Sequence, residues 1–162
     1  MIGLLRPDGL AMYDVTKLKS LAECRTVMQR ARERNRPEVY EAVFRRMCWL
    51  VGNSNDDPND LLVRHFYETL AAYEQLLTEK NRKTTAASRT RQKIANKGVH
   101  QSLIEWTQGK TETNGFKVLV DAGLSEYTGE YLVARFAERF PADIVKLARD
   151  RLSSHNINVP ES

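Results

Sequence analysis

The sequence predicts an all-α protein, a single compact domain of about seven helices. Apolar residues recur at intervals of three and four in segment after segment, which is the spacing of one helix face. The two-residue alternation of a half-buried strand is absent from the first half, and the breaks between segments carry Asn, Pro and Gly. A chain of 162 residues has the length of one domain and can bury a sizeable core.

The N-terminal part, residues 14–80, is expected to hold three helices after an irregular arm of residues 1–13. The first would begin at a cap, Asp14 or Thr16, and end near Arg34. The second would cover residues 38–51, and the third would run from residue 61 to about Lys80, each with a wide apolar stripe. Between them, residues 52–60 (GNSNDDPND) form the clearest predicted loop.

The C-terminal part, residues 84–153, is expected to add at least four short helices. Their ranges are 86–97, 99–109, 128–140 and 141–153, the first closed by Gly98 in a left-handed C-cap. Residues 116–122 (FKVLVDA) fit either a short helix or a strand, because periodicity does not separate the two over so few residues. The segment 154–162 is expected to be a frayed tail.

Positive charge is concentrated in one segment. Residues 80–100 contain seven basic residues and no acidic one, whereas the rest of the chain has 18 basic and 21 acidic residues. A basic segment on a mildly acidic body indicates a polyanionic partner. The arginines between Arg25 and Arg36 have Glu33, Glu38 and Glu41 close by in sequence, so we interpret them as a solvated helix end.

Residues 92–107 (QKIANKGVHQSLIEWT) resemble the helix-turn-helix of phage Cro-type repressors, notably at Gly98, Val99, Gln101, Ser102 and Ile104. The resemblance covers about a tenth of the chain, and it implies a second helix that lies in the major groove of DNA. Lys97 stands where the repressors usually have an apolar residue, and Ile94 stands where they have a small one. An ordinary corner between two helices closed by Gly98 remains the alternative.

These observations predict a nucleic-acid-binding protein, with double-stranded DNA as the expected partner. Short polar residues at the start of the second helix would face bases, and basic residues would contact phosphates. The candidate nucleic-acid-binding residues are Lys80, Arg82, Lys83, Arg89, Arg91, Lys93, Lys97, His100, Gln101 and Ser102. We expect a small regulator or accessory factor, with a possible homodimer surface on the apolar helices of residues 38–78.

Two other classes of function stay open. Arg149 and His155, with five residues between them, resemble the active-site motif of HEPN ribonucleases, in which they would promote attack by the RNA 2′-hydroxyl. An adaptor or inhibitor that binds an acidic protein through the basic segment is the third class.

We expect no cofactor, no catalytic residue and no metal site. The acidic residues Asp56, Asp57 and Asp60 lack the spacing and the terminal Glu of a calcium loop. Cys24 and Cys48 lack metal-ligand spacing, no segment is apolar enough for a membrane helix, and no signal peptide is apparent, so a cytoplasmic protein is expected.

Overall fold

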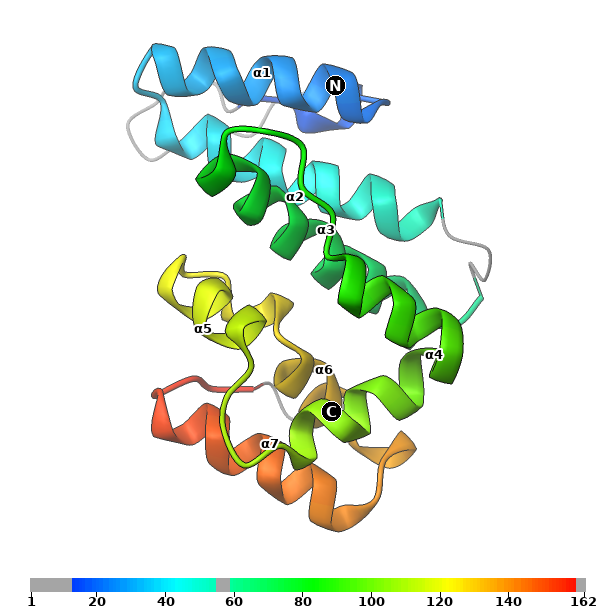
Figure 1. The fold of residues 1–162 in the computed structure, drawn as a ribbon. Coiled ribbons are helices and arrows are strands. Elements are labelled where there is room, and N and C mark those ends of the chain that lie inside the picture. Colours follow the sequence, from blue (N-terminus) through cyan, green and yellow to red (C-terminus); the bar gives the residue numbers. More distant parts are fainter. Residues whose placement is uncertain (1–12, 55–58, 160–162) are drawn as a thin grey trace.

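The computed structural model describes residues 13–54 and 59–159, which form an all-α fold (Figure 1). The helices are α1 (Leu21–Glu33), α2 (Pro37–Asn53), α3 (Leu61–Asn81), α4 (Ser88–Gln108), α5 (Asn114–Asp121), α6 (Gly129–Arg135) and α7 (Ala142–Ser154). Three short 3₁₀ turns, η1 (Val15–Lys17), η2 (Ser125–Tyr127) and η3 (Ala137–Arg139), lie between them. The predicted fold class is therefore confirmed, and the segment at 116–122 is a helix. Most of the arm at 1–13, the loop residues Asp56 and Asp57, and residues 160–162 lie outside the described residues.

The first helix begins later than the sequence predicts. Asp14 caps only the short turn η1, and α1 starts after Ser20, whose Oγ accepts a hydrogen bond from the backbone N–H of Glu23. The Glu23 carboxylate in turn accepts from the backbone N–H of Lys19 at 2.9 Å. This reciprocal arrangement is close to a capping box, which fixes the start of a helix more firmly than a single cap does.

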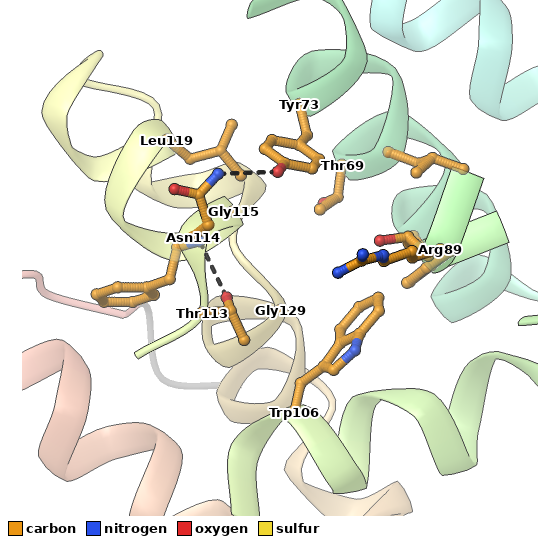
Figure 2. Close-up of a pocket in the computed structure, with 13 residues that line it drawn as sticks. Thr69, Tyr73, Arg89, Trp106, Thr113, Asn114, Gly115, Leu119 and Gly129 are labelled. Atoms are coloured by element: carbon orange, nitrogen blue, oxygen red, sulfur yellow. Dashed lines mark hydrogen bonds between the residues drawn. The ribbon is translucent and has the colours of Figure 1, made fainter. Parts of the chain in front are cut away.

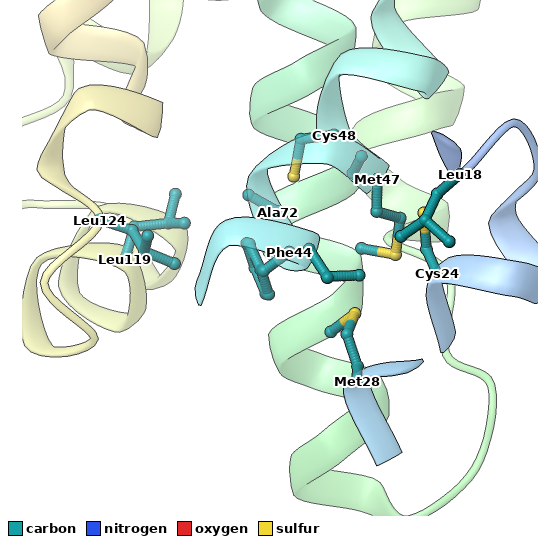
Figure 3. Packing of buried hydrophobic residues seen from close by; sticks show 11 residues of the cluster. Leu18, Cys24, Met28, Phe44, Met47, Cys48, Ala72, Leu119 and Leu124 are labelled. Carbon is teal, nitrogen blue, oxygen red and sulfur yellow. The ribbon is translucent and has the colours of Figure 1, made fainter. Parts of the chain in front are cut away.

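The buried core consists of two large apolar clusters that α3 joins. The first cluster lies among α1, α2 and the middle of α3 and includes Met28, Phe44, Met47 and Ala72 (Figure 3). The second lies between the start of α3 and helices α4, α6 and α7; it includes Leu62, Phe66, Leu70, Leu103, Leu132 and Ile144. Because α3 supplies residues to both clusters, it connects the packing of the N-terminal part, residues 14–80, with that of the C-terminal part, residues 84–153.

The apolar stripes of residues 38–78 face this core. Val43, Phe44 and Met47 are at most 2% exposed, and so are Leu62 and Phe66 of α3. These side chains pack inside the domain, so a homodimer surface on these helices would depend on exposed apolar residues such as Trp49 and Leu61. Cys24 and Cys48 are buried and unpaired in the same cluster.

The predicted tail is packed as far as the structure describes it. His155 caps α7, and Ile157 and Val159 pack against a third small cluster formed by Phe116, Ala134 and Leu152. Fraying was thus the wrong expectation for residues 154–159. Among the described residues, no helix has the length and apolar character to cross a membrane.

Candidate nucleic-acid interface

Gly98 bends α4 in the middle of the basic segment. The two halves of α4 meet at this residue, whose backbone has φ 82° and ψ 168°. A positive φ is favourable only for glycine here, and nothing lies within 4 Å of the place a Cβ would occupy. The ψ lies outside the left-handed helical region, so the predicted left-handed C-cap is wrong in detail. One residue, instead of a three- or four-residue turn, joins the two half-helices.

The predicted base-reading residues do not share an exposed face. Ser102 is 0% exposed, and its hydroxyl donates a hydrogen bond to the Gly98 carbonyl at 2.7 Å. Its predicted contact with bases was therefore wrong, since the hydroxyl is enclosed at the bend. The His100 ring stacks on Phe140 with a centroid separation of 4.7 Å, and its Nε2 lies 2.5 Å from the Arg139 carbonyl oxygen. Gln101 remains exposed.

Lys93 and Lys97 both pair with Glu105. Lys93 Nζ lies 2.8 Å from Glu105 Oε2, and Lys97 Nζ lies 2.8 Å from Glu105 Oε1. Hydrogen bonds from Lys93 and Lys97 lower the pKa of Glu105 to about 2. The two lysines lie before the bend and Glu105 lies after it, so this triad connects the two halves of α4. The predicted binding of DNA phosphates by these two lysines would therefore compete with their ion pairs to Glu105.

Arg91 is also tied to a carboxylate of the protein. Its guanidinium Nη2 lies 2.5 Å from Glu74 Oε1, and Nε lies 3.1 Å from both carboxylate oxygens. The same carboxylate accepts from the backbone N–H of Ala87 at 3.0 Å, which positions the start of α4 against α3. The hydrogen bonds with Glu74 raise the pKa of Arg91.

Four of the predicted cations have no carboxylate partner among the described residues: Lys80, Arg82, Lys83 and Arg89. All four side chains are exposed. Arg82 ends α3 in the left-handed conformation, with φ 55°, and the chain then crosses toward α4 in the loop that passes beside α1 and α2 (Figure 1). Lys80, Arg82 and Lys83 therefore form a group of positive charges without a carboxylate partner at the end of α3 and in this loop, whereas Arg89 lies in the first turn of α4.

The structure places α1 beside this charged region. The sequence interpretation missed this contribution of α1. Arg25, Gln29 and Arg32 of α1 line one hollow of about 470 Å³ together with Arg82. Arg25 also lines a second hollow with Arg91 and Thr84. The spacing of four and three residues between Arg25, Gln29 and Arg32 places them on one helix face, and this signal was available in the sequence. We call the group Arg25, Arg32, Lys80, Arg82 and Lys83 the basic surface.

The motif considered for a ribonuclease is not assembled. His155 Nε2 lies 2.5 Å from Glu112 Oε1, and its ring packs edge-on against Phe116 at 5.2 Å. Arg149 is exposed, and among the described residues no hydrogen bond or ion pair joins it to His155, whose partner is Glu112. The neighbouring Arg151 faces the interior instead, where it bonds Glu130.

The acidic loop gives no metal site in the part of the chain that the structure describes. No group of three or more potential ligands occurs among these residues. Asp60 accepts hydrogen bonds from the backbone N–H groups of Leu62 and Val63 at the start of α3, as a helix cap. It also pairs with Arg139 at 2.6 Å, and the Arg139 hydrogen bond holds the pKa of Asp60 below its usual value.

Comparison of the chain with protein-family models, with curated proteins and with solved structures gives no match. The function is therefore inferred from the geometry and charge of this chain alone.

Proposed function

We propose that this protein binds double-stranded DNA through the phosphate backbone, without catalysis, as a small regulator or accessory factor. The observation that carries the proposal is the hollow that brings Arg25 and Arg32 of α1 beside Arg82 at the end of α3. Two basic groups more than 40 residues apart in the sequence thereby form one surface. Neutralisation of phosphates by such a surface releases counterions, which supplies most of the affinity of non-specific DNA binding.

The charge balance of the basic surface supports a polyanion. Glu79 is the acidic residue that lines the same hollow, and it pairs with Arg32 at 3.1 Å. Arg25, Lys80, Arg82 and Lys83 remain without a carboxylate partner among the described residues. An excess of exposed cations on one face attracts a polyanion and accelerates its association.

Duplex DNA fits this surface better than a single strand does. Single strands bind largely by stacking their bases on open aromatic rings. Tyr40 is the aromatic residue lining the hollow, and its ring is covered by the Arg32 guanidinium, 4.9 Å from the ring centroid. Its hydroxyl also bonds Glu79, so the ring is held in place with one face occupied by the guanidinium, which disfavours stacking of a base on that face.

Any reading of base sequence would depend on Gln101. Among the three predicted base contacts, Ser102 is buried and the ring of His100 is stacked on Phe140, whereas Gln101 is exposed and carries an amide of the kind that forms bidentate bonds to adenine. The Gln101 side chain also hydrogen-bonds Glu105, so contact with a base would compete with that bond. If the second half of α4 enters a major groove, Gln101→Ala changes preference at one base pair by about 1–3 kcal/mol. An equal loss on all sequences would limit the protein to backbone contacts.

The test is fluorescence-anisotropy binding of a labelled 20-base-pair duplex at several salt concentrations between 50 and 200 mM. Arg25→Ala, Arg82→Ala and Lys83→Ala are each expected to reduce the slope of log K against log salt by about one unit. Lys146→Ala serves as a charge-matched control, because Lys146 lies on α7 and pairs with Asp150. Its slope should equal that of the wild-type protein.

Absence of duplex binding at 50 mM salt would contradict the proposal. A stable, salt-sensitive complex with polyglutamate in the same assay, without duplex binding, would instead favour the acidic-protein adaptor. RNA cleavage that His155→Ala abolishes would favour the ribonuclease.

A further inference from the structure

A pocket of about 330 Å³ opens between α3, α4, α5 and α6 (Figure 2). It lies on the part of the fold where the second apolar cluster reaches the surface, and the basic surface does not contribute to it. Its volume falls within the range of about 300–1,000 Å³ that is typical of small-molecule sites.

One side of the pocket is aromatic. Phe66 and Trp106 stack with a centroid separation of 5.7 Å and an angle of 23° between their planes, and both line the pocket. Gly129 of α6 lies behind Trp106, and a Cβ there would come within 3.5 Å of the indole ring. The tighter contact would be with Leu103 Cδ2 at 3.2 Å, so the glycine lets α6 lie close to the second half of α4. Flat aromatic walls favour a planar ligand that stacks on them.

The polar lining of the pocket consists of one cation, Arg89, and neutral groups that include hydrogen-bond donors, and no carboxylate lines it. Arg89 has no acidic partner among the described residues, and its guanidinium projects between Thr69 and Trp106 (Figure 2). Tyr73 accepts a hydrogen bond from Asn114 Nδ2 at 3.1 Å, which leaves its own hydroxyl proton to donate. A cation and free donors without a counter-charge favour an anionic group.

The first turn of α5 adds two further donors. Thr113 Oγ1 accepts from the N–H of Phe116, and the Thr113 carbonyl accepts from Lys117. The backbone N–H groups of Asn114 and Gly115, the two preceding positions, have no partner among the described residues. Both residues line the pocket, where the positive end of the helix dipole adds to the charge of Arg89.

A buried hydroxyl on the pocket wall has no partner. Thr69 is 8% exposed, and its Oγ1 is shielded from solvent without any hydrogen bond. Buried polar atoms are nearly always bonded in folded proteins, so an unmet one beside a cavity indicates a place where a bound molecule completes the bonding. This observation is independent of Arg89 and of the α5 N-terminus.

We propose that this pocket binds a small planar aromatic molecule that carries one anionic group. The ring would stack on Trp106, and the anionic group would be held by Arg89, by the Tyr73 hydroxyl and by the free N–H groups of α5. Aryl carboxylates and nucleoside monophosphates share this chemistry. The site would act independently of the basic surface.

The experiment uses Trp106 as the reporter. Trp49, the other tryptophan, is 42% exposed on α2 and is replaced by Phe, so that fluorescence reports on Trp106 alone. Benzoate, phenyl phosphate and adenosine 5′-monophosphate are titrated, with benzamide and adenosine as neutral partners. Because light absorption by adenosine overlaps that of Trp, Kd values are checked by calorimetry. We expect at least one anionic probe to bind about tenfold or more tightly than its neutral partner.

Two variants test the assignment of the residues. Arg89→Met should weaken the anionic probe about tenfold or more and leave the neutral partner unchanged. Gly115→Leu should abolish binding of both, because the nearest atoms of Tyr73 lie 3.9 Å from a Cβ at this position and a longer side chain fills the pocket. Because Gly115 lies in α5, circular dichroism checks that the Gly115→Leu variant keeps the helix content of the parent protein.

Lys117→Met is the matched control, because it removes a positive charge from the exposed face of α5 outside the pocket. It should bind the probes as the parent protein does. The Arg82→Ala variant, which is expected to weaken only DNA binding, should also bind them as the parent does.

Preference for adenosine 5′-monophosphate would assign the site to nucleotides, and an affinity for benzoate equal to that for adenosine 5′-monophosphate would assign it to aryl acids. The inference is overturned if no probe binds at millimolar concentration, if neutral and anionic partners bind equally, or if Arg89→Met and Gly115→Leu have no effect.

Discussion

Arg151 of α7 pairs with Glu130 of α6 in the interior of the protein, with Nη1 3.1 Å from Oε1. The Glu130 side chain is 2% exposed and that of Arg151 is 12% exposed. The other guanidinium nitrogen donates to the Gly109 carbonyl at 2.8 Å, just beyond the end of α4. One side chain thus neutralises a buried carboxylate and bonds the C-terminal end of a helix, so that α4, α6 and α7 depend on it together.

Removal of this arginine should be strongly destabilising. Arg151→Met leaves Glu130 buried without its partner and exposes the end of α4, so we expect a loss of about 3–5 kcal/mol in the free energy of unfolding. Urea unfolding followed by circular dichroism measures the change. Arg149→Met on the exposed face of the same helix is the control and should stay within about 0.5 kcal/mol of wild type. Equal effects of the two changes would contradict the role given to Arg151.

The same variant should depend on pH in a defined direction. Burial raises the pKa of Glu130, and loss of Arg151 raises it further, because the ionised form then lacks its counter-charge. A carboxyl whose folded pKa is raised favours the folded state below its unfolded pKa, and this stability is lost as the pH rises through the folded value. The deficit of Arg151→Met relative to wild type should therefore shrink as the pH is lowered from neutral toward 4.5, the ordinary value for Glu. A deficit that stays constant or grows would contradict this.

Glu105 should titrate near pH 2, because Lys93 and Lys97 stabilise its ionised form. A lowered folded pKa means that the contribution of this group to stability is present above its ordinary pKa of 4.5 and is lost as the pH falls toward about 2. Carbon-detected NMR of the Glu105 carboxyl measures the value directly. Lys93→Ala and Lys97→Ala should each raise it, whereas Lys146→Ala should not; an ordinary pKa in the wild-type protein would show that the triad is not formed.

Gly98→Ala should cost about 1–3 kcal/mol, the usual cost of a non-glycine residue held in a backbone conformation of this kind. The cost comes from contact of the added methyl group with the adjoining backbone, because no atom of the rest of the fold lies within 4 Å of its position. Gly115→Ala is the matched control; its φ is ordinary and the nearest atoms are 3.9 Å away, so stability should rise by about 0.4–1 kcal/mol. Thermal or urea unfolding compares the two, and a Gly98→Ala variant as stable as wild type would indicate a straight α4.

Ile157→Ala tests the packing of the segment after α7. Ile157 is half-buried against the cluster around Phe116, so we expect a loss of about 1–2 kcal/mol, less than the ~2–5 kcal/mol of a fully buried isoleucine. Asn158→Ala, an exposed neighbour, should be neutral within about 0.5 kcal/mol in the same urea titration. A neutral Ile157→Ala would restore the expectation of a frayed tail.

The sequence by itself determined the fold class and most of the helices. Apolar periodicity located α2 and α3, and Gly98 marked the bend in α4. These features depend on neighbours within one or two turns of the chain, which is the range over which helix caps, glycine conformation and amphipathic faces act. The start of α1 was misplaced, because Asp14 and Ser20 are both good caps and only the Glu23 bonds distinguish them.

Only the tertiary structure decided which polar groups are free. Lys93 and Lys97 look uncommitted in a segment without acidic residues, yet Glu105 reaches them across the bend, and Glu74 reaches Arg91 from another helix. Ser102 is polar in sequence and buried in space, whereas Arg25 and Arg82 line the same hollow although 57 positions separate them. Ion pairing and burial depend on distances between helices, and no local pattern in the chain encodes those distances.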